Sequence, residues 1–463
     1  MLKFARVRPA IATPASRSPE RSLALPWLAL LLLLLQLPLI VNRGYLSFDE
    51  LQWWARADVP AVSELPWHAW SDWRVFQYRP LTFNLWLVIA HALAAHAYAM
   101  HAVFVVLGTV NALLLAVGVR TFGAERNTAA VAAVVFVLSP YVAYTHGWTG
   151  TLADLLVLLF GLLGTLALLA PERPPTRVGV VAFVLALLTL LALLAKESAI
   201  VLPLLWAIVA LARQPRRLPL LAVPAALIVA GYLILRLPAL WFTAAGSAGY
   251  AWTLANVPAR LAEYALFPWL PPLFEVAPSL GRSLLRLSLA GSCVGVVVLA
   301  LLRTHWRLAA TWALVCTLAL APVLVLERSF DQYAYLASAA GIGVIAGAWR
   351  RCGPGARGLL FAAGAIACVH GVQIMLRMRE VGAIEQRFHG DLVAAIASHA
   401  QPLRVDTARA ADAWMLERWV NNVPSYRGTA LAGRVTIGAG VPETFALIMQ
   451  PDGALTPAAL PVH

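Results

Sequence analysis

Charged residues are scarce in this chain, and their scarcity excludes a soluble globular protein. Of its 463 residues, 12% are Asp, Glu, Lys or Arg, whereas 61% are hydrophobic and the mean hydropathy is +0.77. Soluble domains typically carry about 25% charged residues, because their surface has to be hydrated. The composition therefore predicts a polytopic membrane protein.

Several other signals are also missing. The sequence has no glycine-rich phosphate-binding loop, no low-complexity linker and no transporter-like internal repeat. Its four cysteines show no metal-ligand spacing and all fall in or beside apolar segments: Cys293, Cys316, Cys352 and Cys368. We expect them to be packing residues. The chemistry of the protein should therefore be sought in its outer loops.

Apolar segments are abundant, and they predict an all-α body with eleven membrane spans. A span requires about 20 apolar residues, and segments of this kind cover residues 24–42, 99–119, 128–145, 151–169, 178–195, 199–212, 219–240, 286–302, 308–326, 333–349 and 358–376. The first has a long apolar core and no clear cleavage site after it, which indicates a retained anchor. Residues 82–97 are predicted to be a juxtamembrane or half-inserted helix, because a full span there would put later Arg-rich loops outside.

The basic residues give the predicted orientation. A net charge of +13 would suggest a nucleic-acid partner in a soluble protein, but here Lys and Arg gather on one side of the membrane. They lie in the N-terminal segment 1–23 and in the loops near 120–126, 173–177, 213–217, 303–307 and 350–357. By the positive-inside rule this side is cytoplasmic. We therefore expect a multi-pass inner-membrane protein without a nucleic-acid partner, whose odd number of spans leaves the C-terminal segment periplasmic.

Three regions are predicted outside the membrane on that far side. The transmembrane domain, 24–376, has a first outer loop at 43–80 and a second at 241–285. The first loop contains five Trp, which are typical of short helices lying at a membrane interface. The second predicts one short helix and then a proline-rich segment crossing the site. Residues 377–463 predict a small α/β domain, which serves either in acceptor recognition or in packing.

Polar side chains recur at the outer ends of the predicted spans. Asp49 and Glu50 are two adjacent acids just past the first span. Further along, the same side carries Tyr78, Arg79, His146, Asp154, Lys196, Glu197, Arg328, Tyr333 and Tyr335. Ionisable groups near membrane depth are costly unless they serve a pathway or a site. Their common sidedness predicts a functional site at this face.

The order of these motifs resembles the GT-C glycosyltransferases, over roughly residues 20–350. The likeness is closest to protein O-mannosyltransferases and related transferases that use a polyprenyl-phosphate sugar. It rests on the Asp-Glu pair after the first span, Tyr78-Arg-Pro-Leu, the Asp opening the fourth span, Lys196-Glu197 and the Glu327-Arg…Tyr-x-Tyr-Leu-x-Ser segment. Two features depart from the family: no Arg precedes Asp154, and Asp331-Gln332 interrupts the tyrosine-rich segment.

This resemblance implies a reaction and a set of roles. The donor would be a polyprenyl-phosphate-linked sugar, and the acceptor a hydroxyl of a protein, lipid or glycan. Asp49 would be the general base of a single inverting displacement, and Glu50 would orient the acceptor or support Asp49. Lys196, Arg328 and Arg79 would bind the donor phosphate, and the substrate would be contacted by Tyr78, His146, Asp154, Glu197, Tyr333 and Tyr335. No cofactor is assigned; a divalent metal ion is compatible, although no cluster in the sequence requires one.

Plainer interpretations of the same residues are open at this point. Asp49 and Glu50 also fit solvated loop acids, Lys196 with Glu197 a local salt bridge, and Arg328 an ion pair with Glu327 or Asp331. Other residues also fit structural roles: a helix cap for Asp154 and an interfacial histidine for His146. Two further functions are alternatives: a polymerase or ligase of surface polysaccharide, and a transporter or flippase of lipid-linked sugar, for which internal symmetry and charges near the bilayer middle are expected.

Overall fold

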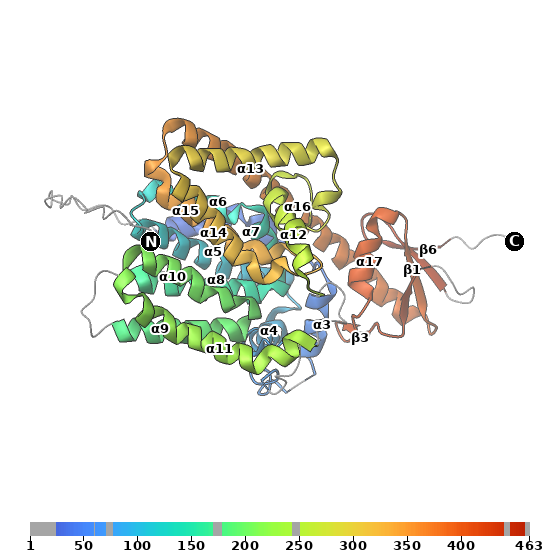
Figure 1. Ribbon diagram of the computed structural model, residues 1–463. Helices are drawn as coiled ribbons and strands as arrows, with labels where there is room; N and C mark the ends of the chain where they lie inside the picture. Colours follow the sequence, from blue (N-terminus) through green and yellow to red (C-terminus); the bar gives the residue numbers. More distant parts are fainter. Residues whose placement is uncertain are drawn as a thin grey trace.

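The computed structural model describes residues 25–59, 61–70, 77–169, 178–242, 251–438 and 445–458. In Figure 1 a body of helices extends from the N-terminus, and a smaller α/β domain lies beyond it at the C-terminal end. Among the described residues, seven helices are long and apolar enough to cross a membrane, or eight if the bent pair α6 and α7 is one span. The chain is therefore a helical, multi-pass membrane protein, as its composition predicts.

The helices of the body match the predicted spans closely. In chain order they are α1 (Leu25–Leu35), α2 (Leu37–Ile40), α3 (Phe48–Ala57), α4 (Pro80–Leu93), α5 (Ala97–Thr121), α6 (Arg126–Val137), α7 (Pro140–Gly147), α8 (Leu152–Leu169), α9 (Val178–Ala195), α10 (Leu202–Arg213), α11 (Leu218–Phe242), α12 (Val257–Leu266), α13 (Leu284–Thr304), α14 (Trp306–Leu324), α15 (Tyr335–Ala348) and α16 (Pro354–Ser398). Three of them, α1, α10 and α15, have only 11, 12 and 14 residues. Helix length alone therefore supports fewer crossings than the eleven predicted.

The segment predicted to be half-inserted forms α4, a helix of 14 residues. In Figure 1 it is seen nearly end-on, whereas α9 and α11 run across the page. Pro80 lies at its first position, where a missing N–H costs nothing. The Thr82 hydroxyl donates to the Ala195 carbonyl at 2.8 Å, so the first turn of α4 lies beside the end of α9.

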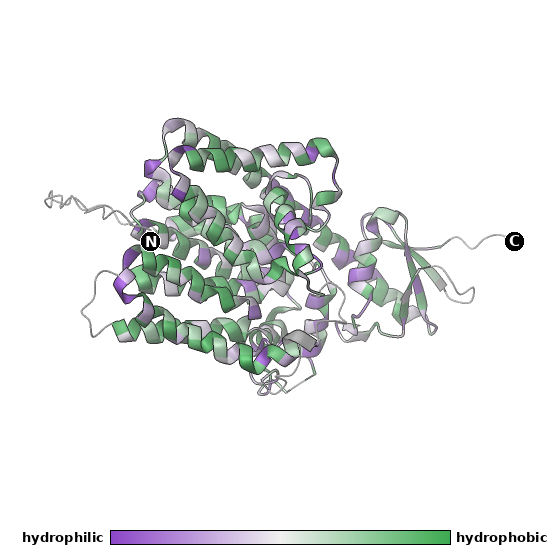
Figure 2. Ribbon diagram, in the orientation of Figure 1, coloured by the Kyte–Doolittle hydropathy of each residue, from purple (hydrophilic) through white to green (hydrophobic). Residues whose placement is uncertain are grey.

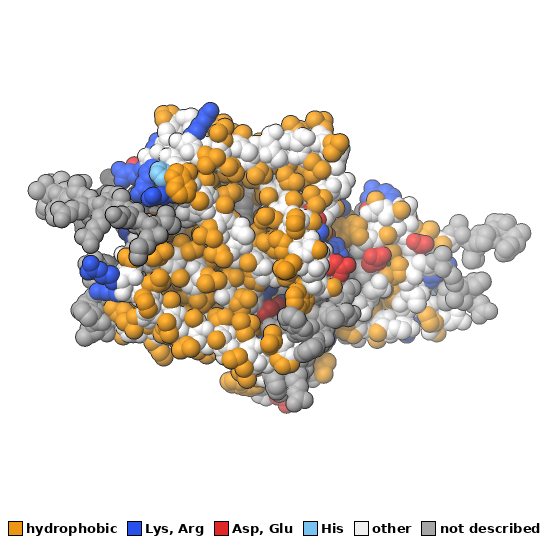
Figure 3. Space-filling view, in the orientation of Figure 1, with side chains coloured by type: hydrophobic (Ala, Val, Ile, Leu, Met, Phe, Trp, Pro, Cys, Tyr) orange, Lys and Arg blue, Asp and Glu red, His pale blue; other side chains and the backbone are white. Residues whose placement is uncertain are grey.

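Polar contacts sort into two sets at opposite ends of the body. At one end Arg350 pairs with Glu125 at 3.3 Å, and Arg213 donates to the Thr121 carbonyl at 3.2 Å. At the other end Lys196 pairs with Asp154 at 2.6 Å. Figure 2 shows largely hydrophobic helices between these ends. In Figure 3 Lys and Arg gather at the N-terminal end, whereas most visible Asp and Glu lie near the C-terminal domain.

The last helix, α16, leads out of the body into the C-terminal domain. It has 45 residues and is therefore about 68 Å long, roughly twice the thickness of a bilayer core. The predicted domain boundary at 376/377 falls inside this helix. The charged stretch from Arg377 is thus a continuation of the last span, because nothing there breaks the helix and Arg377 pairs with Glu380 one turn later at 2.8 Å.

The C-terminal domain contains the small α/β fold that its mixed sequence predicts. Its elements are β1 (Leu403–Thr407), α17 (Ala413–Val420), β2 (Ser425–Tyr426), β3 (Thr429–Ala430), β4 (Val435–Ile437), β5 (Phe445–Met449) and β6 (Leu455–Pro457). One sheet has the order β4-β1-β5-β6, with β1 parallel to β4 and β5 and with β6 antiparallel. The strands β2 and β3 form a separate hairpin. Helix α17 packs on β1 and β4, and also on α3 of the membrane body.

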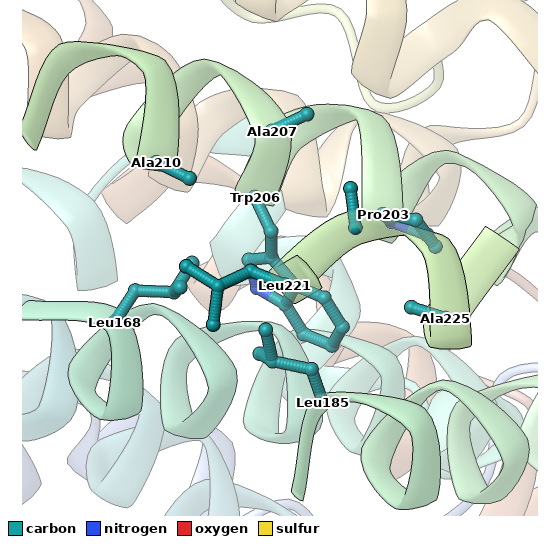
Figure 4. A pocket seen from close by; sticks show the side chains of 9 residues that line it. Leu168, Leu185, Pro203, Trp206, Ala207, Ala210, Leu221 and Ala225 are labelled. Atoms are coloured by element: carbon teal, nitrogen blue, oxygen red, sulfur yellow. The ribbon is translucent and has the colours of Figure 1, made fainter. Parts of the chain in front are cut away.

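An apolar hollow lies between α8, α9, α10 and α11 (Figure 4). It is lined by Leu168, Leu185, Pro203, Trp206, Ala207, Ala210, Leu221, Ala222 and Ala225. Leu168 is 14 residues after Asp154 on α8, a distance of about 21 Å along the helix. None of the residues that line the hollow is ionisable, and among them Pro203, at the start of α10, comes nearest in sequence to Lys196 and Glu197.

Candidate functional site

Asp49 lies in the first turn of α3, a helix that begins with a capping box between Ser47 and Glu50. Its side chain is half-buried. Among the residues that the structure describes, its carboxylate accepts no hydrogen bond and forms no ion pair. Burial raises the pKa of Asp49, and the positive charges of Arg79 and Arg418 oppose that rise. Asp49 is thus a carboxylate near two cations, with its oxygens available to a ligand.

Glu50 is in the opposite situation. It is buried and accepts four hydrogen bonds, from the backbone of Leu46 (2.5 Å) and Ser47 (3.0 Å) and from the backbone and hydroxyl of Thr149 (2.8 and 2.7 Å). Burial raises its pKa to about 7, against the effect of these bonds. Both oxygens are occupied, so the contacts of Glu50 fit the supporting role that was one of its two predicted roles.

Four of the predicted site residues form two neighbouring ion pairs. Arg79 binds Glu197 with two donors, one of them Nε at 2.8 Å from Oε2. Lys196 donates to both oxygens of Asp154, at 2.6 and 2.7 Å. The local pair between Lys196 and Glu197 is not the arrangement found, since each residue pairs with a distant part of the chain. Asp154 is accordingly a partner of Lys196, and no capping hydrogen bond needs to be invoked for it.

Two of the predicted tyrosines lie beside these ion pairs. The Tyr333 ring is 4.3 Å from Lys196 Nζ, within the range of a cation–π contact. Tyr78 donates its hydroxyl to the Trp70 carbonyl at 3.0 Å, and its ring is 5.3 Å from the Arg236 guanidinium. Arg236, on α11, is a buried cation that the sequence analysis missed. A lone Arg within a predicted span was the available signal.

Arg328 lies at the surface. It is exposed, and its guanidinium is 5.8 Å from the Phe330 ring. Among the described residues it has no ion pair with Glu327 or Asp331, the two partners considered from the sequence. Asp331 is instead buried and accepts the Val276 N–H at 3.1 Å, and burial raises its pKa well above the ordinary value. Asp331 thus ties the second outer loop to the segment before α15.

His146 and Tyr335 are placed in the helix core and are not brought together with Asp49. Both are buried, and His146 Nε2 is 2.8 Å from the Tyr335 hydroxyl. His146 Nδ1 is 2.5 Å from Gln36 Oε1, and Asn111 donates to the Tyr335 hydroxyl at 3.2 Å. These side chains satisfy one another among apolar helices, as buried polar groups must. Their contacts give them a structural role in place of the predicted substrate contact.

The C-terminal domain adds a residue that the sequence analysis did not nominate. Arg418 on α17 reaches the second outer loop, where its Nη1 lies 2.6 Å from Glu275 Oε1. The Tyr144 hydroxyl is 3.5 Å from the same oxygen. No local sequence pattern marks Arg418, because its position depends on how the domain packs against the membrane body.

The tryptophans of the first outer loop divide into two groups. Trp53 stacks on Phe83 with ring centroids 4.5 Å apart, and Trp54 is buried against Tyr426, which lies in the C-terminal domain. For Trp54 the predicted role as a membrane anchor is wrong. Trp67 and Trp70 are 69% and 38% exposed, as an interfacial anchor requires; Trp73 lies outside the described residues.

Within the described ranges, no group of three or more His, Cys, Asp or Glu side chains could hold a metal ion. The divalent metal that is compatible with the GT-C resemblance therefore has no evident ligand set in this part of the chain. No known protein family, curated protein or solved structure matches this chain. Functional inference accordingly rests on the residues of the chain itself.

Proposed function

We propose that this protein is an inverting membrane glycosyltransferase with a GT-C-like arrangement of eleven spans. It takes a sugar from a polyprenyl-phosphate carrier and transfers it to an acceptor hydroxyl at the periplasmic face of the inner membrane, with its N-terminus in the cytoplasm. The observation that carries this proposal is Asp49, a half-buried carboxylate without a hydrogen-bond or ion-pair partner among the described residues. The positive charges of Arg79 and Arg418 act on this carboxylate.

The chemistry requires little more than such a base and a set of cations. The acceptor oxygen attacks the anomeric carbon, forming the new C–O bond while the bond to the phosphate oxygen breaks. Asp49 takes the acceptor proton, and the electron pair of the broken bond leaves with the polyprenyl phosphate. The configuration at the anomeric carbon inverts in this single displacement. General-base help of this kind is worth about 10²–10⁴-fold in rate.

The cations among the candidate site residues suit the leaving phosphate. Arg79 and Lys196 are each balanced by a carboxylate, Glu197 and Asp154. The Arg236 guanidinium lies over the ring of Tyr78, the residue that precedes Arg79 in the sequence. Arg236 therefore adds a further positive charge near these pairs. A phosphate that enters the site therefore meets several cationic side chains, and an Arg guanidinium offers it a fork of donors. The exposed Arg328 is the other predicted phosphate ligand, at the membrane surface.

The placement of charge also bears on the alternative functions. A transporter for lipid-linked sugar is expected to place its ionisable residues near the bilayer middle. Here Asp154 opens α8 and Lys196 follows α9, so the charged pair is at the outer ends of these helices. This favours a reaction at the membrane face. A polysaccharide polymerase or ligase shares the use of a lipid-linked donor, and the acceptor panel in the assay separates it from a simpler transferase.

The test is sugar transfer by the purified protein in vesicles. Radiolabelled polyprenyl-phosphate sugars serve as donors, with lipid, protein and glycan fractions of the host as acceptors. We compare wild type with Asp49→Asn, and with Asp58→Asn as a matched control, because Asp58 is the exposed residue that ends the same helix. Asp49→Asn should lower the rate by about 10²–10⁴-fold, whereas Asp58→Asn should leave it unchanged.

The outcomes separate the functions. Equal transfer by wild type and a folded Asp49→Asn protein would remove Asp49 as the base. Movement of labelled donor across the vesicle membrane without any transfer product would support the transporter instead. Elongation of a glycan by many sugars per acceptor would identify a polymerase.

A further inference from the structure

The C-terminal domain is fixed to the segment that carries Asp49. Glu385, on the outer extension of α16, accepts the Tyr45 N–H at 3.1 Å. His389, one turn later, stacks on Tyr426 with ring centroids 4.3 Å apart, and Tyr426 also contacts the Trp54 ring at 5.4 Å. These contacts join α16, the hairpin of β2 and β3, and α3. The domain therefore has a defined position over the helix of the proposed base.

Arg418 joins this domain to the second outer loop through Glu275. It lies on α17, which packs against α3. Its guanidinium is held from two sides, by Glu275 at 2.6 Å and by the Trp414 ring at 4.9 Å. Its side chain is 23% exposed, so its charge is only partly screened by water. Arg418 is also one of the two cations whose charge acts on Asp49.

We propose that Arg418 is a positioning residue of the Asp49 site, supplied by the C-terminal domain to keep Asp49 as a carboxylate. This inference builds on the proposed function, because it assigns the domain a part in preparing the base for the acceptor. It also distinguishes between the two roles that the sequence allows for the domain. The domain then acts on the chemistry of the site and is more than a packing element.

The charges that surround Asp49 give the direction of the effect. Burial disfavours the carboxylate, and Arg79 and Arg418 favour it. Other ionisable groups on the elements packed here include Glu50 and Arg56 on α3 itself, Glu417 on α17, Glu197 paired with Arg79, and Glu275 and Tyr144 at Arg418. Loss of the Arg418 charge raises the pKa of Asp49. When the pH is lowered, Asp49 then becomes protonated at a higher pH than in wild type. The sugar transfer that needs the carboxylate is lost at that higher pH as well.

The experiment measures the ionisation of Asp49 directly and does not depend on turnover. Dicyclohexylcarbodiimide reacts with protonated carboxyl groups in apolar surroundings, and mass spectrometry of fragmented peptides assigns the label to Asp49 or to Glu50. Labelling as a function of pH is compared for wild type, Arg418→Gln and Arg418→Lys. The matched control is Arg404→Gln in the same domain, where the pair with Asp406 is long, at 3.9 Å. The Asp49→Asn protein confirms the assignment of the label.

We expect Arg418→Gln to shift the pH midpoint for labelling of Asp49 upward, because one of the two positive charges that favour the carboxylate is lost. Arg418→Lys keeps the charge and should restore the wild-type midpoint, and Arg404→Gln should not change it. The acidic limb of the transfer rate should shift by the same amount. An unchanged midpoint in Arg418→Gln protein that elutes as a single folded species would overturn the proposal, as would a rate that falls equally at every pH.

This design keeps the two proposals separate. A shifted labelling midpoint without sugar transfer from any donor would uphold the role of Arg418 and reject the proposed function. Transfer that depends on Asp49, with no shift in Arg418→Gln, would uphold the function and reject the role of Arg418.

Discussion

Two adjacent acids, Asp49 and Glu50, have opposite environments in the first turn of α3. Because both follow the first span, the sequence identifies both as candidate site residues. It does not show which role each of them has. The division depends on Thr149, 99 residues further along the chain, which binds Glu50 and leaves Asp49 without a partner among the described residues. The capping box from Ser47 to Glu50 is the one part of this arrangement that a local pattern contains.

The contacts of Glu50 predict a loss of stability on its removal. In Glu50→Ala, the N–H groups of Leu46 and Thr149 and the Thr149 hydroxyl lose a buried acceptor. A buried donor without a partner costs about 1–3 kcal/mol. We expect a clear fall in the thermal unfolding midpoint in detergent. Glu64→Ala, at an exposed position of the same loop, should leave the midpoint unchanged; equal midpoints for both variants would contradict the buried role of Glu50.

The remaining site residues show what a sequence can and cannot give. Asp154 and Lys196 stand out because charged side chains are rare in apolar helices, and the structure pairs them. The same signal selected His146, which lies in the helix core with both ring nitrogens partnered. A polar residue at the end of a predicted span can therefore lie either at the outer face or in the interior of the helical body. Only the positions of the neighbouring helices distinguish them.

At the scale of elements, helix positions follow from apolar length, and most predicted spans coincide with a helix. The second outer loop also has the predicted form, a short helix, α12, followed by a proline-rich segment. In that segment the Val276 N–H donates a hydrogen bond to Asp331. The last predicted span and the charged stretch predicted after it lie in one continuous helix, α16, because a helix does not stop where hydrophobicity stops. Charged residues such as Arg377 and Glu380 continue α16 beyond its apolar part, since they form helices well.

Close packing of α16 gives a prediction at this scale. A Cβ atom at Gly371 would overlap the Leu138 carbonyl oxygen at the break between α6 and α7, whereas a Cβ atom at Gly364 would meet open space. Overpacking of this kind costs about 1–3 kcal/mol, and Gly→Ala in an unobstructed helix gains up to about 1 kcal/mol. Gly371→Ala should therefore lower the thermal unfolding midpoint and Gly364→Ala should not. A higher midpoint in Gly371→Ala would show that the helices part easily there.

At the scale of the whole molecule, the basic loops and the C-terminal domain lie at opposite ends of the helical body. The basic loops meet at one end, as the contact between Arg350 and Glu125 shows, and α16 carries the C-terminal domain away from the other end. This separation could be predicted from loop charges alone. The docking of the domain through Arg418 and Glu275 could not, because it joins residues 143 apart in sequence.

The orientation gives the last prediction. In a protein whose four cysteines are replaced by Ala, Asp406→Cys places an exposed thiol in the C-terminal domain, and Arg216→Cys places one in a basic loop. If the basic loops are cytoplasmic, a membrane-impermeant maleimide should label the first thiol in cells whose outer membrane alone is permeable. The second should react only after the inner membrane is opened. The reverse pattern would invert the topology and place Asp49 in the cytoplasm, where a periplasmic acceptor could not reach it.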